Sequence, residues 1–269
     1  MTHTAQAKIL VFDSGVGGLS ILQALQQVLP GCAYIYASDN AAFPYGTKSP
    51  EYLISRVDTV LQVLIEKTQP DLIVVACNTA STLVLPHIRQ RFVIPIVGVV
   101  PAIKPAAMQS MSGVIGLLGT PGTITRAYTK DLLETFAAHC EVISAGSSEL
   151  VVIAESALRG KAPCQQQLRA LLKPFFEHPQ LDTIVLACTH FPLIKDQLIK
   201  AAPRPVDWVD SGSAIARRVK SILASAPLKE RSRQTAKNAA IFTAQSRDVE
   251  SLHSVLQQFK LTDMVYIEV

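Results

Sequence analysis

Two short segments of the sequence each end in an Ala-Cys pair followed by small polar residues. The first begins at Asp71 and reads DLIVVACNT, the second begins at Asp182 and reads DTIVLACTH, and five of the nine positions are identical. Each places a cysteine, Cys77 or Cys188, at the carboxyl end of an apolar run typical of a buried strand. Ligands bind at that end of the strands in an open α/β sheet. One such cysteine is usually a small buried hydrophobic residue, and apolar strands resemble one another by convergence. Two in matched contexts favour a shared chemical role.

Two thiols in matched positions suit a reaction that needs two acid–base groups around one atom. In a racemisation, one group removes the Cα proton from one face and the other delivers a proton to the opposite face. A thiol with a pKa of about 8.5 can be tuned to exchange protons near pH 7. His190, two residues after Cys188, could hydrogen-bond that thiol, favour its thiolate or act as an acid itself; a capping histidine is the alternative. The developing carbanion needs fixed donors, and backbone N–H groups and four side chains are candidates: Ser14, Asn78, Thr79 and Thr189.

The segment FDSGVGGLS, from Phe12 to Ser20, is a glycine-rich turn between an apolar run and a helical pattern. Its glycines allow tight turning, and free N–H groups at the start of a helix can bind an anion. It matches neither the dinucleotide-binding fingerprint nor the P-loop, because the glycine spacing differs and no Gly-Lys-Ser/Thr follows. We expect a small ligand whose amine faces Asp13 and whose carboxylate meets the N–H groups; an ordinary strand–helix turn is the alternative.

A second loop, SDNAAFPYGTKS from Ser38 to Ser49, contains the turn Pro44-Tyr45-Gly46. On its own it is an ordinary loop. It follows the glycine-rich turn by one strand–helix unit, and the carboxyl ends of parallel strands share one edge of a sheet. We therefore expect the two loops to lie at the same edge.

The elements that position these residues alternate between short apolar runs and longer amphipathic stretches, which predicts an α/β fold with mainly parallel, two-sided sheets. The expected strands are Lys8–Phe12, Ala33–Ala37, Leu72–Ala76, Ile96–Val99, Val114–Leu118, Glu141–Ser144, Ile184–Ala187, Ala240–Thr243 and Met264–Glu268. The expected helices are Leu19–Leu29, Glu51–Lys67, Ala80–Phe92, Ile124–Ala138, Ser148–Leu158, Gln165–Phe176, Leu193–Ala202, Ala214–Ala224 and Asp248–Phe259. A linker is expected at Ala226–Asn238.

Composition narrows the class of protein. The 269 residues are 49% hydrophobic and 17% charged, which excludes a disordered chain. The net charge is +4, and the basic residues are scattered, with the densest stretch at Lys229–Arg233, so no nucleic-acid partner is expected. Without an apolar run of membrane-spanning length or a signal peptide, we expect no membrane association and a cytoplasmic location. The five cysteines form no C-x-x-C pair, so we expect reduced thiols rather than disulfides.

Five motifs in this order resemble the glutamate racemases of the aspartate/glutamate racemase family. They are FDSGVGGLS, PYG, ACNTAS, LGTPGT and ACTHFPL, spread between about Lys8 and Val219. The resemblance implies a cofactor-independent, metal-free isomerase that interconverts L- and D-glutamate and supplies D-glutamate for peptidoglycan and the cell wall. It also implies two pseudo-symmetric α/β domains, residues 1–97 with 206–269 and residues 98–205, with the active site in the cleft between them.

The resemblance also implies roles for individual residues. Cys77 and Cys188 are the two acid–base thiols, Asp13 assists Cys77, and His190 acts beside Cys188. An acidic residue supports the histidine; Glu155 fits best because of its apolar flanks, and Glu149 is the competitor. The residues implied to line the glutamate site are Asp13, Ser14, Pro44, Tyr45, Gly46, Asn78, Thr79, Thr120, Thr123, Thr189 and His190.

Other functions stay open at this point. A racemase of a related amino acid such as aspartate would show itself in the initial rates on the two acids. A thiol hydrolase or transferase would use only Cys188 and His190, and a small-ligand binding protein would bind glutamate without exchange at Cα. A homodimer is compatible with the resemblance. Some members of the family are reported to affect DNA gyrase, but this sequence shows no basic stripe or partner motif that would test such a secondary partner.

Overall fold

The computed structural model describes residues 7–225 and 238–269, and the chain divides into two compact units. The first unit combines Met1–Val99 with Gly212–Val269, and the second is Val100–Ser211. The expected domain boundary at 205/206 is wrong. Strand β8 (Asp207–Val209) pairs in parallel with β7 of the second unit, so residues 206–211 belong there. The expected linker lies outside the described residues, apart from Asn238.

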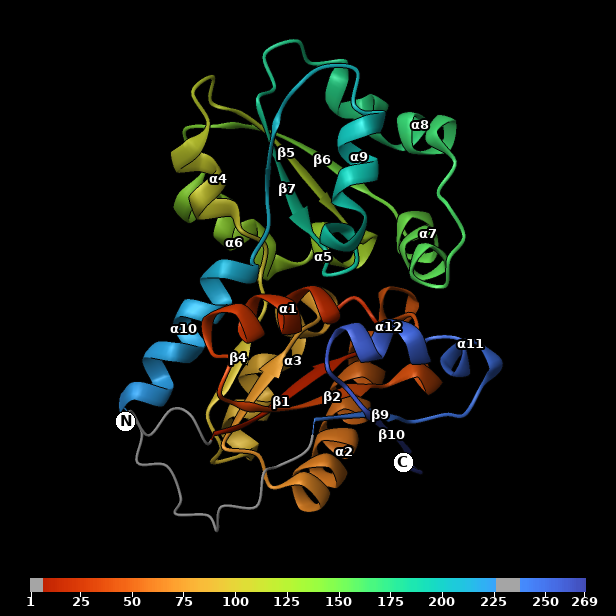
Figure 1. The fold of residues 1–269 in the computed structure, drawn as a ribbon. Helices are drawn as coiled ribbons and strands as arrows, with labels where there is room; N and C mark the ends of the chain where they lie inside the picture. The colour runs from red at the N-terminus through yellow and green to blue at the C-terminus, as the bar shows by residue number, and fades with distance from the viewer. Residues whose placement is uncertain (1–6, 226–237) are drawn as a thin grey trace. The chain divides into compact units, whose positions relative to one another are not determined.

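The first unit is built on a six-stranded sheet in which every pairing is parallel (Figure 1). The strand order is β10-β9-β2-β1-β3-β4, so β9, β2, β1 and β3 lie inside the sheet. The strands are β1 (Lys8–Asp13), β2 (Ala33–Ser38), β3 (Leu72–Val75), β4 (Ile96–Gly98), β9 (Ala239–Phe242) and β10 (Asp263–Tyr266).

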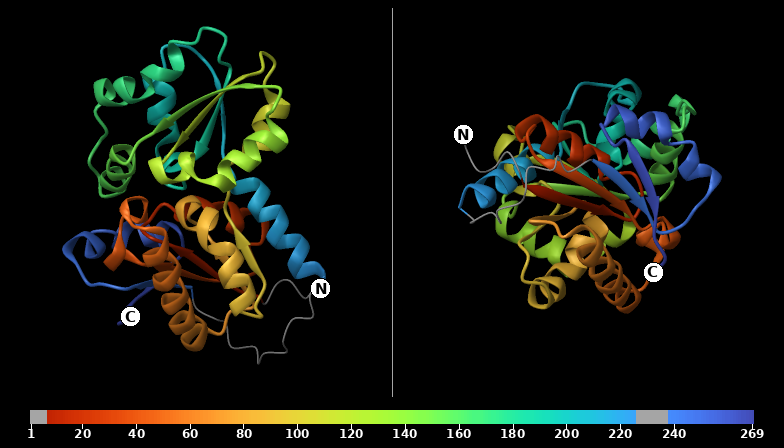
Figure 2. Two further views of the ribbon diagram at one scale, coloured as in Figure 1. Left: turned by 180° about the vertical axis from the view of Figure 1, so that it is seen from behind. Right: turned by 60° about the horizontal axis from the view of Figure 1, so that its bottom comes forward.

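Helices cover both faces of this sheet. α1 packs against α10 on one face and α2 packs against α3 on the other (Figures 1 and 2). Ser49 caps α2 by accepting a hydrogen bond from the N–H of Tyr52, and Pro50 stands at the first helical position, a typical helix start. The helices are α1 (Leu19–Val28), α2 (Pro50–Thr68), α3 (Asn78–Arg91), α10 (Gly212–Ser225), α11 (Arg247–Glu250) and α12 (His253–Gln258), with 3-10 turns η2 (Asn40–Ala42) and η3 (Tyr45–Thr47).

The second unit has a four-stranded parallel sheet in the order β6-β5-β7-β8. α4 and α6 pack together on one face, and α8 and α9 pack together on the other (Figure 1). Ile115, Leu117 and Val185 of the sheet form one buried cluster with α4. The elements are α4 (Ile103–Gln109), β5 (Val114–Gly119), α5 (Pro121–Thr125), α6 (Ala127–Phe136), β6 (Glu141–Gly146), α7 (Glu149–Leu158), α8 (Gln165–Phe176), β7 (Thr183–Ala187), η4 (Phe191–Ile194), α9 (Lys195–Ala201) and β8.

The two sheets repeat one topology. The order β2-β1-β3-β4 in the first unit corresponds to β6-β5-β7-β8 in the second. The loop contacts correspond as well: Asp39 N–H donates to the Asp13 carbonyl at 2.8 Å, and Ser147 N–H donates to the Gly119 carbonyl at 2.9 Å. The predicted fold class, two pseudo-symmetric α/β units, is confirmed. The sequence similarity between the two Ala-Cys segments therefore reflects equivalent strands, β3 and β7.

Several predicted helices are divided in the structure. The helix expected at Ile124–Ala138 breaks at Arg126, which is extended (φ −71°, ψ 146°) between α5 and α6. The helix expected at Leu193–Ala202 begins as η4, and that expected at Asp248–Phe259 is split into α11 and α12. Neither α4 nor β8 was predicted, because each is short and its pattern is weak.

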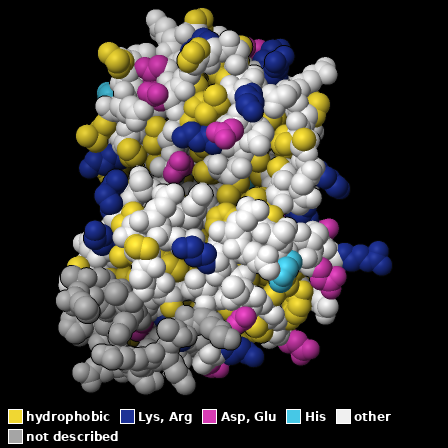
Figure 3. Space-filling view, in the orientation of Figure 1, with side chains coloured by type: hydrophobic (Ala, Val, Ile, Leu, Met, Phe, Trp, Pro, Cys, Tyr) yellow, Lys and Arg dark blue, Asp and Glu magenta, His cyan; other side chains and the backbone are white. Residues whose placement is uncertain are grey.

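Two surface features bear on the expected partners. No helix within residues 7–225 and 238–269 is both long and apolar enough to cross a membrane. On the face shown in Figure 3, Lys and Arg side chains lie in separate small groups rather than in one stripe.

Candidate active site

The first cysteine stands at the carboxyl end of β3. Cys77 is the residue before α3 and is buried, with 6% of its surface exposed. Its Sγ lies 3.9 Å from Ser14 Oγ, which comes from the turn after the neighbouring strand β1. Because the first turn of a helix carries partial positive charge, a negative charge on Cys77 Sγ is favoured there.

The glycine-rich turn is organised by Asp13, which is fully buried. Its Oδ1 accepts a hydrogen bond from Ser14 N–H and its Oδ2 accepts one from Gly18 N–H, each at 2.7 Å. Gly18 is needed for packing, since a Cβ there would lie 3.0 Å from the Cβ atoms of both Ala76 and Asp13. Each oxygen of Asp13 thus accepts a backbone hydrogen bond, which places Ser14 beside Cys77.

Asn78 and Thr79 begin α3 directly after Cys77, and both are buried. Asn78 Oδ1 is buried and has no hydrogen-bond partner among the described residues. A buried acceptor left without a donor costs about 1–3 kcal/mol. This oxygen is therefore suited to accept a hydrogen bond from a bound ligand.

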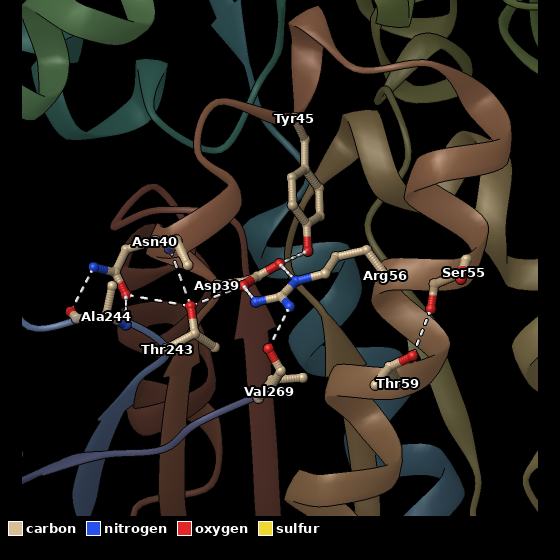
Figure 4. A network of polar contacts seen from close by, with 10 residues as sticks. Asp39, Asn40, Tyr45, Ser55, Arg56, Thr59, Thr243, Ala244 and Val269 are labelled. Atoms are coloured by element: carbon tan, nitrogen blue, oxygen red, sulfur yellow. Dashed lines mark hydrogen bonds and ion pairs between the residues drawn. The ribbon is translucent and has the colours of Figure 1, made fainter.

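The Pro44-Tyr45-Gly46 turn lies in the same unit, where η3 packs against α3. Pro44 follows a cis peptide bond. Tyr45 is 1% exposed, and its hydroxyl donates to Asp39 Oδ2 at 2.7 Å (Figure 4). Burial, followed by the charge and hydrogen bond of Asp39 and the charge of Cys77, raises the pKa of Tyr45 well above its usual value. The phenol of Tyr45 therefore stays protonated, and its O–H donates to Asp39.

The second cysteine stands at the carboxyl end of β7 as one member of a buried chain of polar groups. Cys188 Sγ lies 3.7 Å from His190 Nδ1, and His190 Nε2 lies 2.8 Å from Glu155 Oε1. Arg159, the residue directly after α7, donates through Nη1 to Glu155 Oε2 at 2.8 Å. Cys188, His190 and Glu155 are all less than 7% exposed. The chain runs from thiol to imidazole to carboxylate to guanidinium.

The charge state of His190 follows from these contacts. Burial by itself lowers the pKa of a histidine, but the hydrogen bonds to Cys188 and Glu155 and the charges of both groups outweigh it. The pKa of His190 is thus raised well above its usual value. A protonated imidazole can donate from both nitrogens, so His190 can serve Cys188 Sγ and Glu155 Oε1 at the same time.

Three threonines complete the carboxyl edge of the second sheet. Thr120, after β5, caps α5 by accepting from Thr123 N–H at 3.2 Å, and the two hydroxyls lie 2.9 Å apart. Thr189 separates Cys188 from His190. All three are buried, with at most 5% exposed.

The sequence-predicted residues thus form one group at the carboxyl edge of each sheet. Asp13, Ser14, Tyr45 and Asn78 lie in the unit of Cys77; the remainder of that group is Pro44, Gly46 and Thr79. The group with Cys188 is Thr120, Thr123, Glu155, Thr189 and His190.

The structure separates the two acidic candidates and adds residues that the sequence did not single out. Glu155 contacts His190, whereas Glu149 is exposed and accepts a hydrogen bond from Gln167. Arg159 was missed, although its spacing of four residues from Glu155 is typical of a helical ion pair. Within residues 7–225 and 238–269, no three His, Cys, Asp or Glu side chains are grouped to hold a metal ion.

Comparison with known proteins identifies the family. The model of the Asp/Glu/Hydantoin racemase family matches residues 19–219. The chain belongs to this family. A curated glutamate racemase of Pectobacterium carotovorum subsp. carotovorum is 46% identical over 252 residues, covering 93% of this chain and 88% of that protein. The resemblance to the family and the prediction of a racemase are confirmed.

Solved structures agree. The crystal structure of Escherichia coli glutamate racemase in complex with L-glutamate and the activator UDP-MurNAc-ala has a TM-score of 0.94 and 42% identity. The match covers 98% of this chain and 99% of that one. An aspartate racemase homologue from Pyrococcus horikoshii, at 20% identity and a TM-score of 0.54 over 81% of this chain and all of that one, shares only the fold.

Proposed function

We propose that this racemase interconverts L- and D-glutamate by proton transfer between Cα and two cysteines, Cys77 and Cys188, and so supplies D-glutamate for peptidoglycan synthesis. One observation carries the proposal. Equivalent strands, β3 and β7, end in equivalent cysteines, and each cysteine is buried beside a polar side chain, Ser14 at Cys77 and His190 at Cys188.

The reaction balances without an oxidant or reductant. A thiolate takes the proton from Cα, and the thiol of the other unit gives its proton to the opposite face. The enzyme is left with the thiol and thiolate exchanged, and proton exchange with solvent restores the starting state. A turnover of about 10 per second corresponds to a barrier of roughly 16 kcal/mol, so the carbanion needs stabilisation from fixed donors around the carboxylate.

The environment of each thiol supports a different means of stabilising its charge. At Cys188 the protonated His190, held by Glu155, supplies a full positive charge. At Cys77 the start of α3 supplies partial positive charge, and Ser14 Oγ is within reach of the sulfur. The buried acceptor Asn78 Oδ1 suits the ammonium group of an amino acid.

The sequence predicts that Asp13 faces the amine of the ligand, and the structure limits how it can do so. Both of its oxygens already accept backbone hydrogen bonds. A carboxylate oxygen has a second lone pair, so Asp13 can serve the ammonium only in addition to holding the turn.

Single replacements test the proposal. Cys77→Ser and Cys188→Ser should each abolish racemisation while the far-ultraviolet circular dichroism spectrum stays that of the wild type. Cys164→Ser is the matched control, because Cys164 is exposed and lies outside both groups. Full activity in either of the first two variants would contradict the two-thiol assignment.

The contacts of Cys188 also favour a second candidate function. Thiol, imidazole and carboxylate are arranged as a nucleophile, its histidine partner and a group that orients the histidine, which a thiol hydrolase would use without Cys77. That function predicts a covalent acyl adduct on Cys188, detectable by mass spectrometry, and full activity of Cys77→Ser. Initial rates on glutamate and aspartate separate the two amino-acid substrates.

The homodimer, the cytoplasmic location and the independence from a cofactor stay predictions.

A further inference from the structure

A buried polar network in the first unit lies beyond the residues assigned above, with Asp39 at its centre (Figure 4). Asp39 follows β2 and is fully buried. Its Oδ2 accepts from the Tyr45 hydroxyl at 2.7 Å and from Arg56 Nε at 3.0 Å. Its Oδ1 accepts from Arg56 Nη2 at 2.7 Å and from the Thr243 hydroxyl at 2.8 Å. The carboxylate therefore accepts four hydrogen bonds, two of them from one guanidinium.

The donors come from three separate parts of the chain. Tyr45 belongs to η3, Arg56 to the middle of α2, and Thr243 directly follows β9. Arg56 also donates through Nη1 to the backbone oxygen of Val269 at 3.0 Å. A bidentate guanidinium–carboxylate pair fixes both groups in orientation as well as distance. Asp39 is thereby a rigid anchor rather than a mobile charge.

Tyr45 joins this anchor to the site of Cys77. The hydroxyl end of the ring is bound to Asp39, while η3, to which Tyr45 belongs, packs against α3, the helix that begins directly after Cys77. The hydroxyl donates its proton to Asp39, so Tyr45 meets the site mainly through its ring and backbone, and this hydrogen bond helps to hold both in place.

We propose that Asp39, held by Arg56, is a positioning residue that fixes Tyr45 in the substrate site. The inference rests on the proposed function, because it takes Tyr45 as part of the glutamate site. Asp39 itself does not touch the substrate, since its oxygens are bound to protein donors. Loss of the anchor loosens η3 and weakens substrate binding, while the thiols and the proton-transfer geometry around them are kept.

The test compares kinetic constants and hydrogen exchange for Asp39→Asn, Tyr45→Phe and the double variant. Asp39→Asn should raise KM for both enantiomers by about tenfold and Tyr45→Phe by about threefold, with kcat changed less than KM. The double variant should resemble Asp39→Asn alone, because Asp39→Asn loses the bidentate pair with Arg56 that holds the acceptor of the Tyr45 hydroxyl, and Tyr45→Phe then removes a contact already weakened. Amide exchange across residues 40–48 should accelerate in all three variants.

Two further variants supply a control and a substitute for Asp39→Asn. Tyr34→Phe is the matched control: Tyr34 is equally buried, and its hydroxyl donates at 2.8 Å to the Leu29 carbonyl instead. It should lower the melting temperature slightly and leave KM unchanged. If Asp39→Asn does not fold, Arg56→Lys takes its place, since lysine keeps the charge but loses the bidentate geometry.

The outcomes separate this inference from the proposed function. If the wild type racemises glutamate and folded Asp39→Asn keeps the wild-type KM, or if the two replacements multiply in the double variant, the positioning role is overturned. A wild type without racemase activity overturns the proposed function instead. Hydrogen exchange at residues 40–48 then still decides whether Asp39 holds the loop, because unchanged exchange in the variants refutes it.

Discussion

Replacing Glu155 by Gln removes one negative charge from the buried chain at Cys188 and with it the ion pair to Arg159. Glutamine has nearly the same shape and keeps an oxygen that can accept from His190 Nε2, now 2.8 Å from Glu155 Oε1. Glu155 contributes two of the influences that raise the pKa of His190, its hydrogen bond and its charge, whereas burial, which lowers that pKa, stays. The replacement therefore lowers the pKa of His190.

The expected loss of activity follows from the lost positive charge beside Cys188. General acid–base groups contribute about 10²–10⁴-fold to rate. Glu155 acts through His190, so we expect the lower end, a loss of about 100-fold in kcat/KM, equivalent to about 2.7 kcal/mol. The alkaline limb of the pH profile of kcat/KM should move to lower pH. Because the two enantiomers have equal free energy, kcat/KM must fall equally in both directions, which checks the assay internally.

Stability should change with a defined sign. A histidine whose pKa is raised in the folded state stabilises the fold fully below its unfolded pKa of about 6.5, and the contribution is lost as pH rises through the folded value. Exchanging a charged for a neutral hydrogen bond costs about 1–2 kcal/mol. The difference in unfolding free energy between wild type and Glu155→Gln should therefore be largest near pH 6 and shrink as pH rises.

The assay is polarimetry across pH, with urea unfolding at pH 6 and pH 9. Glu149→Gln is the matched control, because Glu149 is an exposed carboxylate on the same helix. A folded Glu155→Gln enzyme with wild-type kcat/KM and an unmoved alkaline limb would show that Glu155 does not act on His190, as would equal losses in the two variants.

Three further predictions concern other parts of the chain. Gly18→Ala should destabilise the protein by about 1–3 kcal/mol in urea unfolding and raise KM, because the new Cβ would crowd the Cβ of Asp13 at 3.0 Å in a closely packed turn; unchanged stability would show that the turn can shift freely. For Asp182, burial opposes ionisation, but hydrogen bonds, foremost that from Ser110, outweigh it and hold the pKa at about 2. The stabilisation by Asp182 is thus present above about pH 3.9 and lost as pH falls through 2. Because this group is only partly buried and solvent screens its charge, Asp182→Asn should cost only about 1 kcal/mol at pH 7. A difference in unfolding free energy that persists in acid would be the contrary result. The Cys164 thiol is exposed, so a disulfide reagent should modify it first, without loss of activity. Inactivation in step with the modification of Cys164 would contradict the assignment of Cys77 and Cys188 as the reacting thiols.

Much of the fold is predictable because its strands are long apolar runs. β1, β2 and β5 lie within two residues of their predicted limits. β8 was missed because it has three residues at the edge of the sheet, and its pairing with β7 decides its existence. The break at Arg126 was missed because it depends on contacts formed only in the fold, such as the Thr129 hydroxyl donating to the Thr123 carbonyl at 2.6 Å.

The candidate site divides in the same way. The two cysteines are predictable because the chain repeats one strand–turn pattern, and Glu155 is predictable over Glu149 because apolar neighbours bury it. The Asp39–Arg56 pair is not predictable, since the residues stand on different elements and nothing in their spacing links them. An ion pair between two secondary-structure elements depends on how those elements pack together. A local pattern of residue types does not show that packing.

The most direct test of the two-thiol racemase follows L-glutamate in D₂O with metal-free, pyridoxal-free enzyme. Optical rotation and deuterium at Cα are measured together from the first turnovers. The two-thiol mechanism predicts that rotation decays to zero and that early D-glutamate carries solvent deuterium, while the remaining L-glutamate carries little, because different groups remove and deliver the proton. Unchanged rotation without deuterium at Cα, in enzyme shown to be folded, would contradict it.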